Sequence, residues 1–200
     1  MSAERDYLSL PLRAFLTDAG SKSPTPGGVS VAAVVGALSA CLARMAVAYS
    51  ASKPQFAEHE GRLQALLDEF QQARDTFGQL MSDDMAAYEQ LAAARARGDD
   101  ERQQALLKAI AVPMEIIVQA VALAARLNEM KTFTNPHLMS DLQAAAVLAS
   151  AAARAAATSL ESNLAGLADR HEAERLGDQL DQLLARLDRH HNTVMNYLPE

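Results

Sequence analysis

Asp84 is the residue whose type and position best suit acid–base chemistry. It shares one face of a predicted helix with Phe77, Met81 and Tyr88, at the spacing of an apolar stripe. A carboxylate on that face is either desolvated or faces a cleft, and burial raises the pKa of a carboxyl group, as proton transfer near neutral pH requires. The alternative is that Asp83 and Asp84 are solvated neighbours at an irregularity of the helix.

A pair of glycines, Gly27 and Gly28, offers a second kind of chemistry. They follow Ser-Pro-Thr-Pro and precede Val29 and Ser30, where a run of small residues predicts a helix. Glycine adopts backbone geometry that is closed to other residues, and the free N–H groups at a helix start favour a carboxylate or phosphate. The alternative is that the glycines only permit a sharp entry into the helix and close packing.

Polar residues around a loop-to-helix junction form the third candidate group. Asn135 lies in a predicted loop, and Ser140 and Asp141 follow at the expected start of a helix, where either is an ordinary N-cap. Asn163 lies later on the same helix, on an otherwise apolar face. A buried amide there needs hydrogen-bond partners, which either a ligand or a facing helix can supply.

Other reactive residue types give no comparable pattern. The five histidines lack metal-ligand spacing, so no metal site is predicted, and the single cysteine, Cys41, excludes an intrachain disulfide. Cys41 lies in an apolar stretch and is expected to be buried. Arg44 and Arg154 interrupt apolar helices. They could pair with Asp84 or with an anionic ligand, and the alternative is that their side chains extend to the surface.

The elements that must position these residues are all predicted to be helices. Helical spacing and breaker residues indicate a first helix over about 7–16, ended by Gly20, and a small-residue helix over 28–52. Further helices are expected over 55–97, with a possible break near Gly78 or Ser82, over 99–131 with a kink at Pro113, over 140–169 and over 171–196. Residues 132–139 are predicted to form a loop.

Composition fits this architecture. The 200 residues are 50% apolar but only 4% aromatic, and alanine-rich, β-branch-poor chains favour closely packed helices. We therefore predict one all-α domain over residues 1–200, a bundle of about six helices. Such a core gains little area per residue, so we expect packing between subunits as well.

Charge and hydropathy limit the partners and location that we expect. The net charge of −7, without a basic stripe, argues against nucleic acid as a partner. The first 18 residues carry charges and lack the apolar core of a signal peptide. The most apolar window, 29–50, contains Arg44 and many small residues, which is typical of a core or interface helix rather than a membrane span. We expect a cytoplasmic protein without a membrane association.

Taken in order, these motifs resemble the cyclodeaminase/cyclohydrolase family. The resemblance covers about residues 8–175 and begins with Phe15-Leu16 and the stretch from Ser23 to Ala33. It continues through Asp84 in an Asp-x-x-Ala-[Phe/Tyr] stretch and through Ala-Val-Pro at 111–113. It ends with Asn135, Ser-Asp-Leu at 140–142, Asn-Leu at 163–164 and the aspartate at 169.

The resemblance implies a fold, a site and a reaction. Family members form all-α dimers with a folate cleft near the subunit interface, which implies site roles for Gly27, Gly28, Ser30, Asp84, Asn135, Ser140 and Asp141. The implied activity is formiminotetrahydrofolate cyclodeaminase or methenyltetrahydrofolate cyclohydrolase, with a folate substrate and no cofactor. Carboxylates can stabilise the methenyl cation and move a proton, so Asp84 and Asp141 are the catalytic candidates. The glycine turn or Lys22 can receive the glutamate of the folate tail.

The chain also departs from the family pattern at four positions of the expected cleft. Val29 replaces a third glycine, Ala86 a glutamate, Thr134 a glycine and Ser159 an asparagine. Two alternatives therefore stand beside the folate enzyme. One is a divergent, non-catalytic homologue that binds a small anionic ligand, and the other is a helical interaction scaffold.

Overall fold

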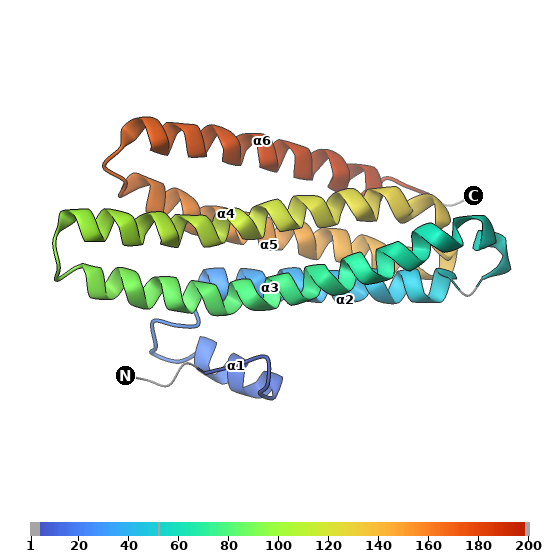
Figure 1. Cartoon of the computed structure of the whole chain (residues 1–200). Helices are drawn as coiled ribbons and strands as arrows, with labels where there is room; N and C mark the ends of the chain where they lie inside the picture. The colour runs from blue at the N-terminus through green and yellow to red at the C-terminus, as the bar shows by residue number, and fades with distance from the viewer. Residues whose placement is uncertain (1–4, 52, 199–200) are drawn as a thin grey trace.

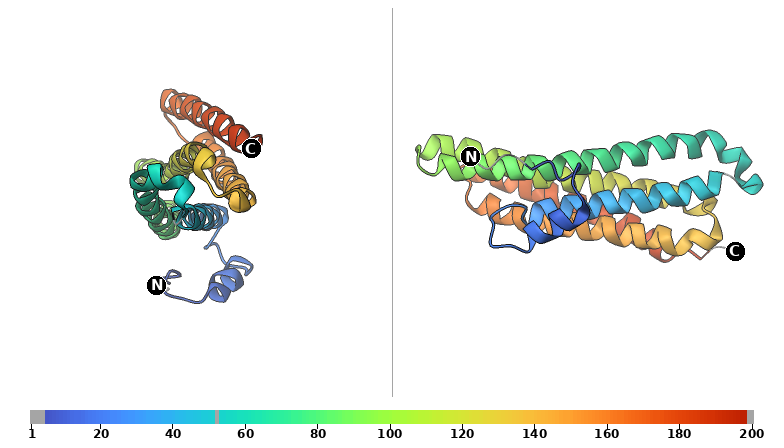
Figure 2. Two further views of the ribbon diagram at one scale, coloured as in Figure 1. Left: turned by 90° about the vertical axis from the view of Figure 1, so that its right-hand side faces the viewer. Right: turned by 90° about the horizontal axis from the view of Figure 1, so that it is seen from below.

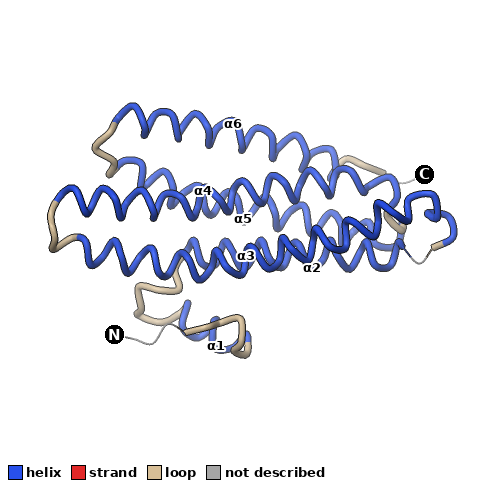
Figure 3. The backbone as a smooth tube through the Cα atoms, in the orientation of Figure 1, coloured by secondary structure: helices blue, strands red, loops and turns tan. Residues whose placement is uncertain are grey.

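Long antiparallel helices build the molecule. The computed structural model describes residues 5–51 and 53–198, which form α-helices and short 3₁₀ turns and include no strand. The α-helices are α1 (Leu12–Ala19), α2 (Gly28–Ala51), α3 (Glu60–Ala94), α4 (Asp99–Met130), α5 (Met139–Ala165) and α6 (Arg170–Met195) (Figures 1 and 3). The predicted all-α bundle of about six helices is confirmed.

Helix α2 packs against both α3 and α5 at one corner of the four-helix group (Figure 2). Its inward residues are small, and Ala32, Ala33, Ala40 and Ala43 are fully buried. Small side chains let the helix backbones approach closely. At Gly36 the approach is closest, because a Cβ atom there would lie 2.5 Å from the ring of Phe77 on α3.

The alternating direction of the helices decides which residues can meet. Helix α2 runs away from the glycine turn, α3 returns, α4 runs away again and α5 returns (Figure 1). One end of the bundle therefore gathers the start of α2, the end of α3, the start of α4 and the end of α5. The opposite end gathers the end of α2 and the α4–α5 connection.

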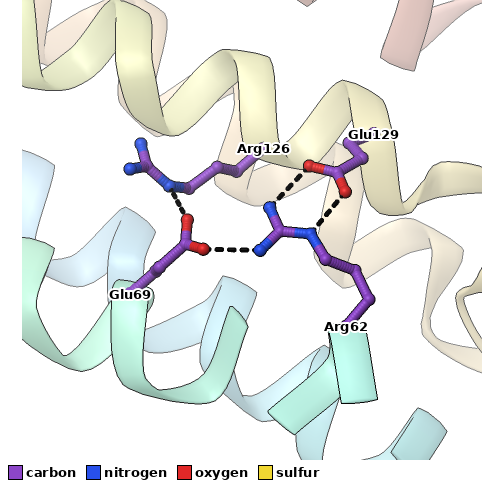
Figure 4. Close-up of polar contacts among 4 residues, drawn as sticks. All are labelled: Arg62, Glu69, Arg126 and Glu129. Atoms are coloured by element: carbon purple, nitrogen blue, oxygen red, sulfur yellow. Dashed lines mark hydrogen bonds and ion pairs between the residues drawn. The ribbon is translucent and has the colours of Figure 1, made fainter. Parts of the chain in front are cut away.

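An ion-pair network joins α3 to α4 on the side of the bundle (Figure 4). The guanidinium of Arg62 donates to Glu129 at 2.5 and 2.7 Å and to Glu69 at 2.5 Å, and Arg126 also donates to Glu69. Although burial raises the pKa of Glu69, the hydrogen bonds from the two arginines outweigh it, and the pKa lies below its ordinary value. The hydrogen bonds from Arg62 likewise lower the pKa of Glu129.

The first and last helices lie outside this four-helix core. Helix α6 packs on α4 and α5 through Leu176, Leu180, Leu183 and Leu187, which repeat every three or four residues. Helix α1 lies to one side, below α2 and α3 in Figure 1, and Figure 2 shows it standing off the bundle. Its main anchor is the buried Phe15.

Several predicted helix boundaries are wrong, for identifiable reasons. Helix α1 begins only after Pro11, because proline is tolerated at a helix start but not inside it. The chain bends at Phe56, within a 3₁₀ turn over Pro54–His59, and α3 then runs unbroken through Gly78 and Ser82. Helix α4, by contrast, runs as one element through Pro113, as predicted.

The start and end of α5 also differ from the prediction. Leu138 occupies the N-cap position, so Ser140 and Asp141 lie in the first turn rather than capping it. The predicted loop before it contains two 3₁₀ turns, Lys131–Phe133 and Pro136–Leu138. The helix ends at Ala165, and the aspartate that was expected to end it, Asp169, caps α6 instead by accepting from the Glu172 N–H at 3.1 Å.

One burial prediction is also wrong. Cys41 is exposed on the outer face of α2. Apolar residues occur around nearly the whole circumference of this helix, so the sequence pattern does not separate its inner face from its outer face.

Candidate functional site

Asp84 and Ser30 form the polar centre of the candidate site. The Ser30 hydroxyl, which is fully buried, donates a hydrogen bond of 2.6 Å to Oδ2 of Asp84. Ser30 lies in the first turn of α2, where backbone N–H groups have no partner within the helix. Helix α2 has no acidic residue in its own first turn, so the carboxylate that faces this positive helix end comes from α3.

The protonation of Asp84 reflects two opposing influences. Burial raises its pKa, and the hydrogen bonds from the side chain and backbone of Ser30 lower it. Burial dominates, so the pKa of Asp84 lies above the ordinary value of 3.8. A carboxyl group with this balance holds its proton more readily than a solvated one, which is what an acid–base group requires.

A cavity of about 290 Å³ opens beside this pair. It lies at the end of the bundle where the start of α2 meets α3, α4 and α5. Its lining residues are Pro24, Thr25, Gly27, Gly28, Val29, Asp84, Tyr88, Leu91, Arg95, Ala109, Ser159 and Asn163. The structure thus brings Gly27, Gly28, Asp84 and Asn163 together around one space, with Ser30 directly behind Asp84.

The glycines contribute space rather than unusual backbone geometry. Gly98 is the one glycine with a positive φ among the described residues, so Gly27 and Gly28 do not use a conformation closed to other residues. A Cβ atom on Gly28 would lie 4.0 Å from the Ser159 hydroxyl, an ordinary van der Waals contact, so close packing does not require a glycine there. The absence of side chains here lets a ligand approach the helix start. Val29 lines the same cavity and takes part of that space.

Asn163 both lines the cavity and holds two helices together. Its Nδ2 donates to the Ala109 carbonyl oxygen of α4 at 3.1 Å, so a facing helix supplies a partner for this amide. The same contact fixes the side chain at the cavity wall, next to Ser159.

The remaining predicted residues lie at the opposite end of the bundle. The Asn135 N–H donates to Ser50 Oγ, near the end of α2, at 2.9 Å, and the Asn135 side chain accepts from the His137 N–H. Twenty residues of α2 separate Ser30 from Ser50, which is about 30 Å of helix. Within one chain, therefore, Asn135, and with it Ser140 and Asp141 at the start of α5, does not reach the Asp84 cavity.

Several cavity residues, Tyr88 and Arg95 among them, were not singled out from the sequence as ligand contacts. Tyr88 lies on α3 one turn beyond Asp84, and Arg95, directly after the last residue of α3, lies three turns beyond it, at the spacing that keeps both on the face of Asp84. Their helical spacing from Asp84 is the sequence feature that could have identified them as cavity residues. Lys22, expected as a cation for the site, is exposed and does not line the cavity. Arg154 pairs with Asp188 of α6 on the surface rather than with Asp84.

Metal-binding groups do not gather in the part of the chain that the structure describes. No set of three histidine, cysteine, aspartate or glutamate side chains there has the arrangement that would hold an ion. The ionisable groups that line the cavity are instead the carboxyl group of Asp84, the phenol of Tyr88 and the guanidinium of Arg95.

Comparison with known proteins identifies the family. A family model described as formiminotransferase-cyclodeaminase matches residues 11–182. The chain belongs to the formiminotransferase-cyclodeaminase family. This assignment confirms the resemblance seen in the sequence and covers all the residues that line the cavity.

Individual family members add detail. Rat formimidoyltransferase-cyclodeaminase is 32% identical over 153 residues, which make up 72% of this chain but only 28% of the rat protein. A methenyltetrahydrofolate cyclohydrolase of Methylorubrum extorquens is 30% identical over 187 residues, 87% of this chain and 88% of that protein. The crystal structure of formiminotetrahydrofolate cyclodeaminase from Thermotoga maritima matches with a TM-score of 0.92 at 28% identity, over 94% of this chain and 95% of that one.

Proposed function

We propose that this protein is an enzyme of one-carbon folate chemistry, acting as a formiminotetrahydrofolate cyclodeaminase or a methenyltetrahydrofolate cyclohydrolase. The observation that carries the proposal is the Asp84–Ser30 pair beside a cavity at a helix start, in a chain of this family. The full-length similarity to a cyclohydrolase and to a cyclodeaminase structure supports an enzyme over an interaction scaffold. No cofactor is needed, because both reactions use only proton transfer and addition or elimination.

Asp84 can serve either reaction. In cyclodeamination, nitrogen-10 of the folate attacks the formimino carbon on nitrogen-5, and a protonated Asp84 gives its proton to the departing ammonia. In cyclohydrolysis, water adds to the cationic methenyl carbon and the Asp84 carboxylate accepts a proton from it. In both, a carboxylate close to the methenyl cation stabilises its positive charge.

We further propose a homodimer whose interface includes the outer face of α2. Val31, Val35, Leu38, Leu42, Met45 and Tyr49 are separated by alternating intervals of four and three residues, and none of them is buried within the chain. This is the apolar repeat by which two helices pack along a common seam. A two-fold axis that pairs α2 antiparallel with its copy would place the start of one α2 beside the end of the other.

This antiparallel dimer would bring the predicted site residues at the far end of the bundle to the active site of the other subunit. Asn135, Ser140 and Asp141 belong to the end of the bundle that would approach the Asp84 cavity of the other subunit. We therefore keep Asp141 as a catalytic candidate, and Asn135 and Ser140 as substrate-binding candidates, in a site shared between two chains. We also propose a cytoplasmic enzyme that works without nucleic acid.

Two helical segments, Gly28–Ala51 and Asp99–Phe133, are long and apolar enough to cross a membrane, but core helices of soluble proteins share these properties. About half of each apolar window is buried inside the bundle. For Gly28–Ala51, the proposed dimer accounts for the remaining apolar face.

The decisive experiment measures turnover of both substrates. Purified wild-type protein should accelerate the loss of methenyltetrahydrofolate absorbance, or its appearance from formiminotetrahydrofolate. Asp84→Asn should lower the rate by about 10²–10⁴, the usual contribution of a general acid or base. Arg154→Gln, on the distant α5–α6 surface, is the matched control and should retain wild-type activity. A wild-type rate equal to the buffer rate for both substrates would refute the enzyme assignment.

A further inference from the structure

The cavity contains two charged side chains, and they stand at opposite ends of one stripe on α3. Among the described residues that line it, Asp84 is the one carboxylic acid and Arg95 the one basic residue. Tyr88 and Leu91 lie between them, so the four follow at intervals of four, three and four residues. At 3.6 residues per turn this keeps them within about 30° of a common line along the helix.

Arg95 is free to meet a ligand. It follows the last residue of α3 with helical backbone angles of −57° and −26°, so it continues the face of the helix. Its side chain makes no hydrogen bond or ion pair with residues 5–51 or 53–198, whereas Arg62, Arg126 and Arg154 are all paired with carboxylates. An unpaired guanidinium at the wall of a cavity is suited to a carboxylate, which it can bind through two parallel hydrogen bonds.

We propose that Arg95 binds the glutamate carboxylate of the folate substrate while Tyr88 and Leu91 pack against its p-aminobenzoyl ring. The inference rests on the proposed folate function and adds the orientation of the substrate in the cavity. The one-carbon unit lies at Asp84 and the tail extends along α3 toward its C-terminal end. Arg95 thus takes the role for which Lys22 was considered.

The distances are compatible with this placement. Asp84 and Arg95 are about 16 Å apart along the helix axis, and helical side chains lean toward the N-terminus, which brings the long arginine closer to Asp84. In the folate, an aromatic ring and one amide separate nitrogen-10 from the first glutamate carboxylate, a span of roughly 10 Å at ordinary bond lengths. The reach of the arginine side chain covers the difference.

The chemistry of the stripe matches the order of groups in the substrate. From Asp84 onward it offers a carboxylate, an aromatic ring, an aliphatic side chain and a cation. From the one-carbon unit onward a folate offers a developing cation, an aromatic ring, an amide and one or more anions. Reversing the substrate would place its carboxylates beside Asp84, where like charges repel.

The test compares two substrates that differ only in the tail. Methenyltetrahydrofolate and methenyltetrahydropteroate, which lacks the glutamate, are measured with wild type, Arg95→Gln and Arg97→Gln. Arg97 is exposed two residues away and lines a separate groove, so it is the matched control. In wild type and in Arg97→Gln, the KM for the folate should be about tenfold lower than the KM for the pteroate. In Arg95→Gln that preference should fall to near one, and Arg95→Lys should restore part of it.

The possible results distinguish failure of the Arg95 role from failure of the proposed folate activity. An active wild type whose preference for the folate survives in Arg95→Gln would overturn the role of Arg95 and leave the folate enzyme intact. A wild type that turns over neither substrate would overturn both. A second measurement does not need turnover: p-aminobenzoylglutamate should inhibit wild type competitively and should inhibit Arg95→Gln about tenfold less, and equal inhibition of the two would contradict the proposal.

Discussion

Asp84 performs two tasks at once. It provides the carboxyl group at the start of α2 that this helix lacks in its own first turn, and we propose that it is also the acid–base group of the cavity. The two tasks share Ser30, since the hydroxyl and backbone of Ser30 oppose the effect of burial on the Asp84 pKa. Ser30 therefore sets how easily Asp84 gains or loses its proton.

Replacing Ser30 with alanine should move the pH dependence of catalysis. Loss of the hydroxyl removes a hydrogen bond that lowers the pKa of Asp84, so this pKa rises further above its ordinary value. If Asp84 acts as a base, the acidic limb of the rate profile moves to higher pH. If it acts as an acid, the alkaline limb moves in the same direction. The rate at the optimum should fall by about tenfold.

Which limb of the pH profile moves also distinguishes the two reactions. An acidic limb that moves identifies the base of cyclohydrolysis, and an alkaline limb identifies the acid of cyclodeamination. Ser23→Ala is the control, because Ser23 bonds only to the Thr25 carbonyl in the preceding turn. A Ser30→Ala profile that superimposes on the wild-type profile would show that Asp84 does not limit the rate.

At the scale of the helices, the closest approach occurs between α2 and α3. The Phe77 ring is fully buried and occupies the space where a Cβ atom of residue 36 would lie. The same two helices carry Ser30 and Asp84, each about two turns further toward the cavity. Their spacing therefore decides whether the 2.6 Å hydrogen bond can form.

Gly36→Ala should destabilise the protein by about 1–3 kcal/mol, because an added methyl group forces a buried ring to move. Urea denaturation followed by circular dichroism measures the loss. Gly177→Ala is the control: it lies inside α6 with no neighbour within 4 Å of its Cβ position, and it should stabilise the protein by about 0.5–1 kcal/mol. Equal effects of the two changes would contradict the close contact.

The α3–α4 ion-pair network should contribute stability that depends on pH. Arg62→Gln should cost about 1 kcal/mol at neutral pH, a modest amount because about a third of the side chain is exposed. The pKa values of Glu69 and Glu129 are lowered on folding, so this stability is present above the ordinary value of 4.5 and is lost as the pH falls through the folded values.

Chemical denaturation at several pH values tests this expectation. The difference between wild type and Arg62→Gln should be largest near neutral pH and should vanish in strong acid. Arg74→Gln removes an exposed pair with the adjacent Asp75 and should change stability little at any pH. A pH-independent loss in Arg62→Gln would indicate a packing effect instead.

The sequence predicts the helices well and their ends less well. Helical periodicity and alanine content identify the core elements, because burial repeats with the helix period. The exact ends of the helices depend on which neighbouring residue starts or caps the helix, and hydrophobic periodicity does not identify that residue. Pro11 delays the start of α1, and Leu138 rather than Ser140 precedes α5. Cys41 was misplaced because α2 is apolar on both its inner and outer faces.

Helical periodicity also predicts part of the candidate site. Asp84 could be recognised as a charge on an apolar stripe, and its neighbours Tyr88 and Arg95 follow from the same periodicity. The pairing of Ser30 with Asp84 spans 54 positions and depends on the antiparallel return of α3, which no local pattern reveals. The separation of Asn135 from Asp84 likewise follows from topology.

At the scale of the whole molecule, the two groups of predicted residues lie at opposite ends of α2. A shared site in an antiparallel dimer makes a quantitative prediction. Asp84→Asn and Asp141→Asn should each be inactive alone, and their random mixture should recover about a quarter of wild-type activity, because half the dimers are mixed and each contains one intact site.

Two substitutions, one inside and one outside the proposed α2 interface, are the controls for the mixing experiment. Leu38→Glu places a charge in the α2 seam and should yield a monomer by light scattering, with loss of activity. Leu107→Glu, at a similarly exposed leucine on α4, should leave the assembly unchanged. A mixture that stays inactive while the protein is dimeric would assign the whole site to one chain.

In the proposed binding mode, the spacing from Asp84 to Arg95 along α3 fixes the length of the ligand that the cavity accepts. Deleting one residue between Tyr88 and Arg95 would rotate the arginine by about 100° and remove it from the cavity, whereas inserting four would turn it by only about 40° and carry it about 6 Å further along the axis. Relatives that act on longer or shorter substrates should therefore differ in this segment by whole helical turns. The preference of the enzyme for substrates of a given length should then change when one turn of α3 is added or removed.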